Sequence, residues 1–159
     1  MNDMLLPKSS AYRIYWLGKW LERAENIARL IDSVYFKVSD DTTLGETEDW
    51  LPIVKALGAE TCLNEVTGKD PSNVSPKEIV SILVFGNTSS SILNCLKIAK
   101  VNAQSVAQKS LFIQVNKAFE YLHNIDPQGI TSMYELHDVM TNVISDCMSI
   151  TEQVGREWF

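Results

Sequence analysis

The sequence of 159 residues lacks any cluster of basic residues. Its 14 lysines and arginines are outnumbered by 20 acidic residues, and the formal net charge at pH 7 is −6. A nucleic-acid-binding protein neutralises phosphates with a concentrated basic surface, so this balance argues against a DNA or RNA partner. The chain also lacks a run of 18 apolar residues, and we therefore expect no helix that crosses a membrane.

Cysteine and histidine are too few and too scattered to predict a metal site. Cys62, Cys95 and Cys147 include no Cys-x-x-Cys pair, and His123 and His137 have no partner at zinc-ligand spacing. We therefore expect neither metal nor cofactor, with the cysteines as small buried hydrophobic residues in a reducing compartment. The first ten residues have no basic start and no long apolar stretch, which predicts no signal peptide and a cytoplasmic protein.

Glycine and proline are also scarce, at seven and five residues, and this leaves room for long uninterrupted helices. Apolar residues recur at intervals of three and four nearly throughout, whereas the alternation typical of strands is absent. No break is long enough for an inter-domain linker. The sequence therefore predicts an all-α fold, a single antiparallel helical bundle of about five to seven helices over residues 1–159, with a long N-terminal helix.

Turn and capping residues divide the chain into the expected helices. Ser75-Pro76-Lys77-Glu78 and Ser132-x-x-Glu135 are capping boxes that each begin a helix. Pro52 is tolerable if it falls in the first turn of its helix. The expected segments are a helix from Ser9 or Ser10, after Pro7, to about Val38, one from Trp50 to Gly58, one from Glu78 to about Phe85, one from Ser91 that continues with or without a kink to Leu122, and one from Ser132 to about Ile150.

The stretch YWLGKWLERAENIARLID, residues 15–32, has two distinct sides. At about 100° per residue, a broad apolar arc predicts burial against at least two neighbouring helices, with Trp16 and Trp20 as core residues. The opposite flank collects a compact set of polar residues and one glycine. That set, our candidate binding face, consists of Gly18, Glu22, Glu25, Asn26 and Arg29.

Two interpretations of this face remain open. Glu25 and Arg29 have the favourable i, i+4 order, and ion pairs of this kind on an exposed helix contribute only a few tenths of a kcal/mol. Gly18 favours a functional or inter-helix contact, because a glycine within a helix costs about 0.5–1 kcal/mol relative to alanine. A solvated face gains nothing from that cost, whereas a close approach by a backbone or ligand would use the space.

The same stretch closely resembles the signature helix of the bacterial alpha-E domain family, an all-helical domain named for its Glu-Arg motif. In that family an aromatic-Trp pair and a glycine precede Leu-Glu-Arg-Ala-Glu-Asn, Ala-Arg and an apolar-Asp ending. The matching residues are Tyr15, Trp16, Gly18, Leu21, Glu22, Arg23, Ala24, Glu25, Asn26, Ala28, Arg29 and Asp32. The resemblance continues through Trp50 and Leu57-Gly58 to Ser89–Val106 and reaches about Asn116.

The departures from the family pattern concern charge. The family's Ala-Arg-Glu-Asn-Ala-Arg segment reads Ala99-Lys100-Val101-Asn102-Ala103-Gln104 here, and its next Arg-Glu pair is Ala107-Gln108. Family members are also usually about twice this long, with a second Glu-Arg helix. The ending VGREWF, residues 154–159, is similar to the approach to that helix. This predicts a truncated, split or reduced chain whose apolar surface favours pairing with a second chain.

The resemblance implies a companion of peptide-ligating or peptide-processing systems. Its expected partners are ATP-grasp-type amide ligases or transglutaminase-like proteins. We weigh a non-catalytic interaction subunit first, because no nucleophile and base are paired in the sequence. An enzyme or ligand-binding subunit for peptide modification that uses Glu22, Glu25 and Arg29 as acid–base and binding groups is the second hypothesis. A purely structural helical protein is the third.

Overall fold

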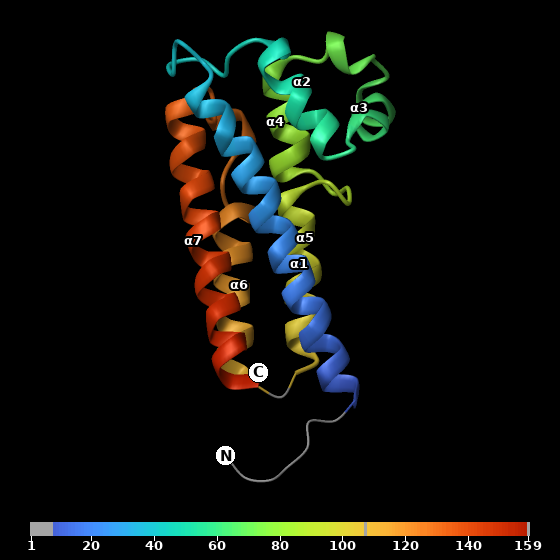
Figure 1. Ribbon diagram of the computed structural model, residues 1–159, viewed down its shortest axis with the longest axis vertical. Coiled ribbons are helices and arrows are strands. Elements are labelled where there is room, and N and C mark those ends of the chain that lie inside the picture. Colours follow the sequence, from blue (N-terminus) through green and yellow to red (C-terminus); the bar gives the residue numbers. More distant parts are fainter. Residues whose placement is uncertain (1–7, 107, 159) are drawn as a thin grey trace.

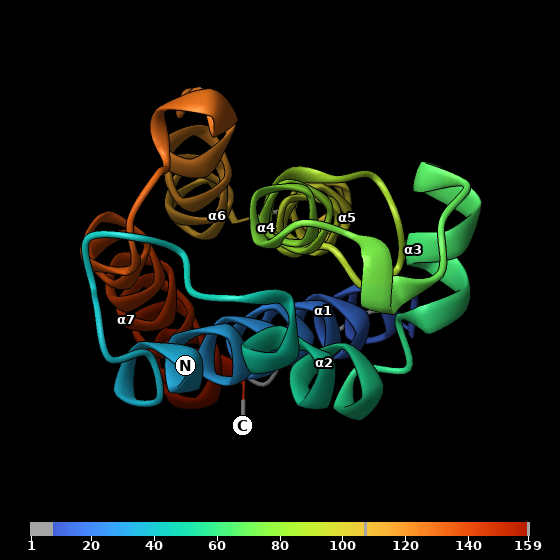
Figure 2. The same ribbon diagram turned by 90° about the horizontal axis from the view of Figure 1, so that it is seen from above.

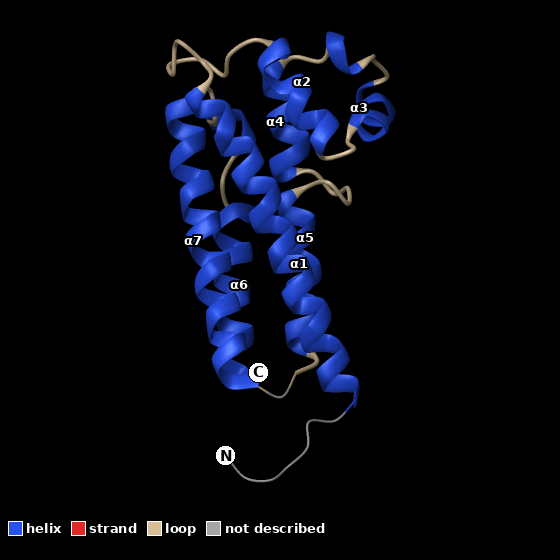
Figure 3. Ribbon diagram, in the orientation of Figure 1, coloured by secondary structure: helices blue, strands red, loops and turns tan. Residues whose placement is uncertain are grey.

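The computed structural model describes residues 8–106 and 108–158, and within these ranges the chain is helical and has no strand (Figure 3). This confirms the predicted all-α fold with a long N-terminal helix. Pro7, Ala107 and Phe159, which entered the expectations above, lie outside the described residues. The helices are α1 (Lys8–Ser33), η1 (Val34–Phe36), α2 (Thr47–Ala56), α3 (Glu60–Thr67), η2 (Pro71–Asn73), α4 (Pro76–Phe85), α5 (Ile92–Gln104), α6 (Lys109–His123), η3 (Pro127–Gly129) and α7 (Met133–Trp158).

Four helices, α1, α5, α6 and α7, form an antiparallel bundle (Figure 1). The helix α1 packs against α5 and α7, and α6 packs against the same two helices from the other side. Successive members of the bundle run in opposite directions, with short connections between α5 and α6 and between α6 and α7 and a long one between α1 and α5. The centre of the bundle is filled by the apolar stripes of all four helices, which belong to one continuous hydrophobic core.

The helix α1 contacts both α5 and α7. Its 26 residues span roughly 39 Å at 1.5 Å per residue, so the helix reaches along the whole bundle. Its buried residues recur at intervals of three and four, which places them on one side. They are Ile14, Leu17, Leu21, Ala24, Ile27, Ala28 and Ile31.

The segment between α1 and α5 packs at one end of the bundle. The helix α4 lies nearly in line with α5, and α2 and α3 lie beside them (Figures 1 and 2). Trp50 anchors α2, because its ring is fully buried and its Nε1 donates a hydrogen bond to the Leu44 carbonyl oxygen at 2.7 Å. This end of the molecule supplies the residues 86–91 that connect α4 to α5.

The N-cap serine of both predicted capping boxes is confirmed. The Glu78 amide donates to Ser75 Oγ at 3.2 Å, and the Glu135 amide donates to Ser132 Oγ at 3.1 Å. The predicted position of Pro52, however, is wrong. A capping box formed by Glu46 and Asp49 starts α2 at Thr47, so the proline lies within the helix rather than in its first turn.

The predicted continuation of the Ser91 helix to Leu122 is also wrong. The chain turns back after Gln104, and α5 and α6 pack side by side as an antiparallel pair. The Ser105 and Val106 amides bond to the Asn102 and Ala103 carbonyl oxygens, which tightens the last turn of α5. This turn contains neither glycine nor proline, so none of its residues predicts the end of a helix. The last helix extends beyond the predicted Ile150 to Trp158.

Candidate functional site

The predicted binding face lies entirely on α1, and the structure divides it between two sides of the helix. Glu25 and Arg29 face α7. Arg29 Nε donates to Glu25 Oε2 at 2.9 Å, and its Nη2 lies 3.2 Å from Met148 Sδ. The expected i, i+4 pair therefore exists, and it also brings α1 against α7.

The same side of α1 ends in a pair that the sequence did not predict. Asp32 Oδ1 and His137 Nδ1 are 2.6 Å apart, although 105 residues separate them in the chain. The Tyr35 ring stacks on the His137 ring, with ring centroids 4.3 Å apart and an interplanar angle of 14°. Next to this pair, an open cleft of about 460 Å³ lies between α1 and α7. Its lining residues are Arg29, Asp32, Thr141, Ile144, Ser145, Met148, Ser149 and Glu152.

Gly18 has no close neighbour within the described part of the chain. A Cβ atom built on this residue would meet no heavy atom within 4 Å. The inter-helix close approach that would require a glycine is therefore not made by α5 or α7. Gly18 lines neither of the two clefts beside α1.

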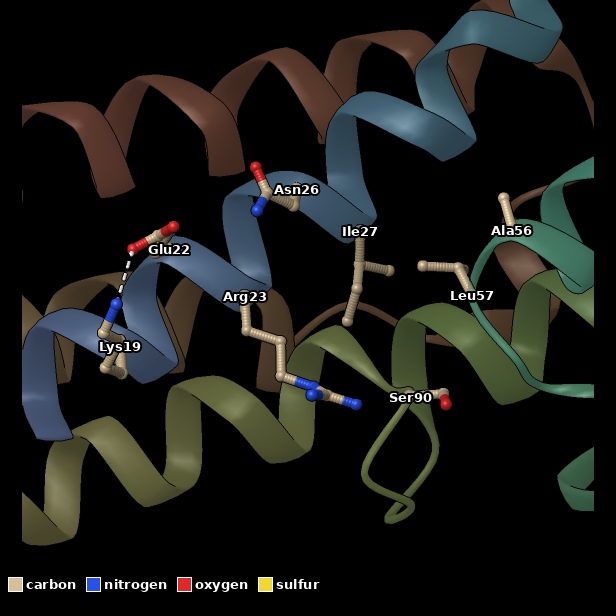
Figure 4. A pocket seen from close by; sticks show the side chains of 8 residues that line it. All are labelled: Lys19, Glu22, Arg23, Asn26, Ile27, Ala56, Leu57 and Ser90. Atoms are coloured by element: carbon tan, nitrogen blue, oxygen red, sulfur yellow. Dashed lines mark ion pairs between the residues drawn. The ribbon is translucent and has the colours of Figure 1, made fainter.

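The second cleft beside α1 lies on the side that faces α2 and the connection 86–91 (Figure 4). Its volume is about 340 Å³. Glu22 and Asn26, two members of the predicted face, lie on its rim, and Glu22 Oε2 is 3.8 Å from Lys19 Nζ. Ile27 and Leu57 approach each other across it. The complete lining is Lys19, Glu22, Arg23, Asn26, Ile27, Ala56, Leu57 and Ser90.

Arg23 is the functional candidate that our site prediction omitted. Its side chain crosses from α1 toward the connection 86–91 (Figure 4), and its Nε donates to the Ser89 carbonyl oxygen at 2.8 Å. Its guanidinium carbon also lies 5.8 Å from the centre of the Trp20 ring. The signal was present in the sequence, because Arg23 is the arginine of the Glu-Arg motif. Its partner lies 66 residues away and could not be found by helical spacing.

The connection 86–91 is held tightly from within as well. Ser91 Oγ donates to the Ile82 carbonyl oxygen at 2.6 Å and accepts from the Thr88 amide at 3.3 Å. A Cβ atom on Gly86 would collide with the Ile82 carbonyl oxygen and with Ser91 Oγ, so only glycine fits there. Ser91 thus secures the connection to α4 instead of capping α5 with its side chain.

Three aromatic residues near the start of α1 are exposed to solvent. Tyr12 is 61%, Tyr15 53% and Trp16 38% exposed. The Trp16 ring packs edge-on against both tyrosine rings, with centroids 6.3 and 5.4 Å apart. The prediction that Trp16 belongs to the core is therefore wrong, because this residue lies at the margin of the apolar arc. Trp20, on the same arc, is half-buried against the core.

Two of the three cysteines are buried beside α1. Burial raises the pKa of the Cys95 thiol to about 11, and the positive charge of Arg23 partly offsets that rise. Burial raises the pKa of Cys147 to about 12, with a further rise from the negative charge of Glu25. Cys62 is only half-buried, contrary to the expectation for all three cysteines. Histidine, cysteine and acidic side chains form no group of three suited to a metal ion within the described residues.

These features define an all-helical protein built around a Glu-Arg helix that contacts both neighbours in a bundle. The chain belongs to the Alpha-E family, described as a predicted alpha-helical domain with a conserved ER motif, whose family model matches residues 6–110. The resemblance seen in the sequence is thereby confirmed over the N-terminal part. Comparisons with curated proteins and with solved structures found no match. None of the helices described is long and apolar enough to span a bilayer.

Proposed function

We propose that the protein is a non-catalytic helical interaction subunit, acting as one domain, that binds a protein partner through the exposed side of α1. The observation that carries this proposal is the cluster of Tyr12, Tyr15 and Trp16, which are large and exposed on the signature helix. Tyrosine, tryptophan and arginine are the residues that dominate binding energy at protein interfaces. An exposed aromatic cluster of this kind indicates a contact surface.

The charge around the cluster favours an acidic partner surface. Residues 8–21 of α1 contain Lys8, Arg13 and Lys19 and no acidic residue, although the whole chain has a net charge of −6. Opposite charges across an interface steer association and select partners. From the family resemblance we infer the partner class, an ATP-grasp-type ligase or a transglutaminase-like protein of a peptide-synthesis or peptide-modification system.

The remaining residues of the predicted binding face fit the same proposal. Gly18 leaves open space beside the aromatic cluster, which a partner helix can approach closely. Glu22 and Asn26 lie along the cleft that continues from the cluster, while Glu25 and Arg29 are already engaged with each other.

The catalytic alternative receives less support. Acid–base work on a peptide by Glu22, Glu25 and Arg29 needs these groups around one open site. Instead, Glu22 lines the cleft beside α2, Arg29 lines the cleft beside α7, and Glu25 is paired with Arg29.

Copurification with an ATP-grasp protein encoded beside this chain tests the proposal. We expect Trp16→Ala and Gly18→Leu each to weaken retention at least tenfold, because one removes an aromatic anchor and the other fills the space beside it. Circular dichroism should show that both variants stay helical.

Phe36→Ala is the matched control, because Phe36 is an aromatic residue 78% exposed outside α1, and it should leave retention unchanged. Retention that is unchanged in Trp16→Ala and Gly18→Leu would overturn the proposed face. Light scattering on the same samples tests self-association, and a dimer that Trp16→Ala dissociates would identify a second copy as the occupant.

A further inference from the structure

A separate cavity of about 280 Å³ lies beside residues 86–87, at the start of the connection 86–91. The end of α4, the first two turns of α5 and the last two turns of α6 line it, and no described residue of α1 is among the lining residues. Its lining residues are Phe85, Gly86, Asn87, Leu93, Asn94, Lys97, Phe119 and His123. The volume is slightly below the range of about 300–1,000 Å³ for sites that bind drug-sized molecules, so the cavity suits a smaller ligand.

The walls of this cavity are largely aromatic and aliphatic. Phe119 and His123 stack with their ring centroids 5.0 Å apart and an interplanar angle of 17°. Phe85 and Leu93 contribute further apolar surface from α4 and α5. Flat aromatic surfaces of this kind pack well against the ring or branched chain of a small ligand.

The polar groups of the cavity are one lysine ammonium, one histidine ring and two side-chain amides. Lys97 and His123 are on its rim, the Lys100 ammonium lies 4.8 Å from the centre of the Phe119 ring, and no acidic residue lines the cavity. The side-chain amides of Asn87 and Asn94 make no hydrogen bond to any other described residue, so both can donate to a ligand. The cavity thus combines amide donors with the positive charge of Lys97, although the whole chain has a net charge of −6.

We propose that this cavity binds a small organic carboxylate with an aromatic or branched aliphatic body. The body packs between Phe85, Leu93 and Phe119, and the carboxylate faces Lys97 and the two asparagine amides. A charge-assisted hydrogen bond to an ammonium group is stronger than a bond between neutral groups. The charge therefore selects a carboxylate over its neutral amide.

The wall formed by residues 86–87 is fixed before any ligand arrives. Ser91 ties the connection to the end of α4, and Arg23 ties it to α1 through the Ser89 carbonyl oxygen. A site that is already ordered loses little conformational entropy on binding. The cavity is thereby preorganised by the arginine of the Glu-Arg motif.

Titration of the ¹⁵N-labelled full chain with phenylacetate, phenylacetamide and acetate tests this site by amide chemical shifts. Phenylacetate should give saturable shifts at Asn94, Lys97 and the Asn87 side chain. Phenylacetamide lacks the charge and acetate lacks the apolar body, so each should bind at least about tenfold more weakly.

Lys97→Met should weaken phenylacetate binding by a similar factor, and because Lys97 is exposed the variant should fold normally. Lys55→Met is the matched control, since this exposed lysine on α2 is remote from the cavity, and it should bind like the unmodified chain. The inference is overturned if phenylacetate gives no saturable shifts, if the amide binds equally well, or if Lys97→Met binds with unchanged affinity.

Discussion

The two sides of α1 cover two buried cysteines in opposite electrostatic settings. On one side, Arg23 lies beside Cys95 and partly offsets the rise in its pKa that burial causes. On the other side, Glu25 lies near Cys147 and adds to the rise caused by burial, so the pKa of Cys147 reaches about 12 against about 11 for Cys95. With Arg23 added to the predicted face, the polar surface of α1 thus consists of two half-faces, one beside Cys95 and one beside Cys147, with different electrostatic effects.

The comparison also separates two ways of joining helices. Arg23 reaches across to backbone and holds the connection 86–91, which has little regular structure of its own. Glu25 and Arg29 bond to each other, and Arg29 also contacts Met148 of α7. Loss of the Arg23 side chain should therefore destabilise the connection 86–91, because it removes a charged hydrogen-bond donor to the backbone. Loss of the Glu25–Arg29 ion pair should change the stability little.

The largest expected effect is on thiol reactivity, because the thiolate is the reactive form. At pH 8 a disulfide reagent should modify one thiol of the native protein, the half-buried Cys62, and the other two only in denaturant. The rates should differ by at least about 100-fold, since each unit of raised pKa lowers the thiolate fraction tenfold. Two or three fast thiols in the native state would contradict the burial of Cys95 and Cys147.

These pKa shifts also predict how stability changes with pH. The pKa of each buried thiol is raised above its ordinary value of 9.0, so the folded state binds more protons than the unfolded state at alkaline pH. The free energy of unfolding should therefore decrease as pH rises above about 9. Urea titrations at pH 8 and pH 10 check this, and Cys95→Ala with Cys147→Ala should reduce the difference between the two values.

The next effect separates the two half-faces by their arginines. Arg23→Met should lower the free energy of unfolding by about 1–2 kcal/mol, because it removes a charged donor to the Ser89 carbonyl oxygen. Arg29→Met should cost about 0.5 kcal/mol or less, as expected for an exposed ion pair. Urea unfolding measures both, and hydrogen exchange at residues 86–91 should accelerate only in Arg23→Met. Equal costs would remove the distinction between the half-faces.

The last comparison concerns two glycines, Gly18 in open and Gly86 in crowded surroundings. Gly18→Ala should raise the free energy of unfolding by about 0.5–1 kcal/mol, because the added methyl group meets open space and the helix gains propensity. Gly86→Ala should instead destabilise, since its methyl group would collide with the Ile82 carbonyl oxygen. Thermal unfolding monitored by circular dichroism compares them. A destabilising Gly18→Ala would reveal a contact that the structure of the isolated chain does not contain.

Local features of the sequence predicted local features of the fold well. The helix starts at Ser75 and Ser132 were predictable because the capping residues and their partners are three positions apart. The apolar residues of α1 recur at intervals of three and four, and this spacing predicted which side of the helix is buried. The prediction for Trp16 was wrong because this residue lies at the margin of the apolar arc, where helical spacing alone does not show whether a side chain is covered.

Contacts between distant segments were beyond the reach of periodicity. The partners of Arg23 and Asp32 lie 66 and 105 residues along the chain, and no local spacing encodes them. The turn between α5 and α6 has neither glycine nor proline, and the apolar pattern alone predicts a continuous helix there. The residues of the predicted binding face all lie on α1, but helical spacing could not show that the surrounding helices divide them between two sides of α1.

The packing of α1 against α5 and α7 has a consequence for biosynthesis. The apolar side of α1 is complete when Ser33 has been added, yet its partner helices begin only at Ile92 and Met133. At the ribosomal rate of about 5–20 residues per second, this interval is on the order of several seconds. During that time the apolar side of α1 has no native partner helix, so we expect α1 to be the first segment of the nascent chain that a chaperone binds.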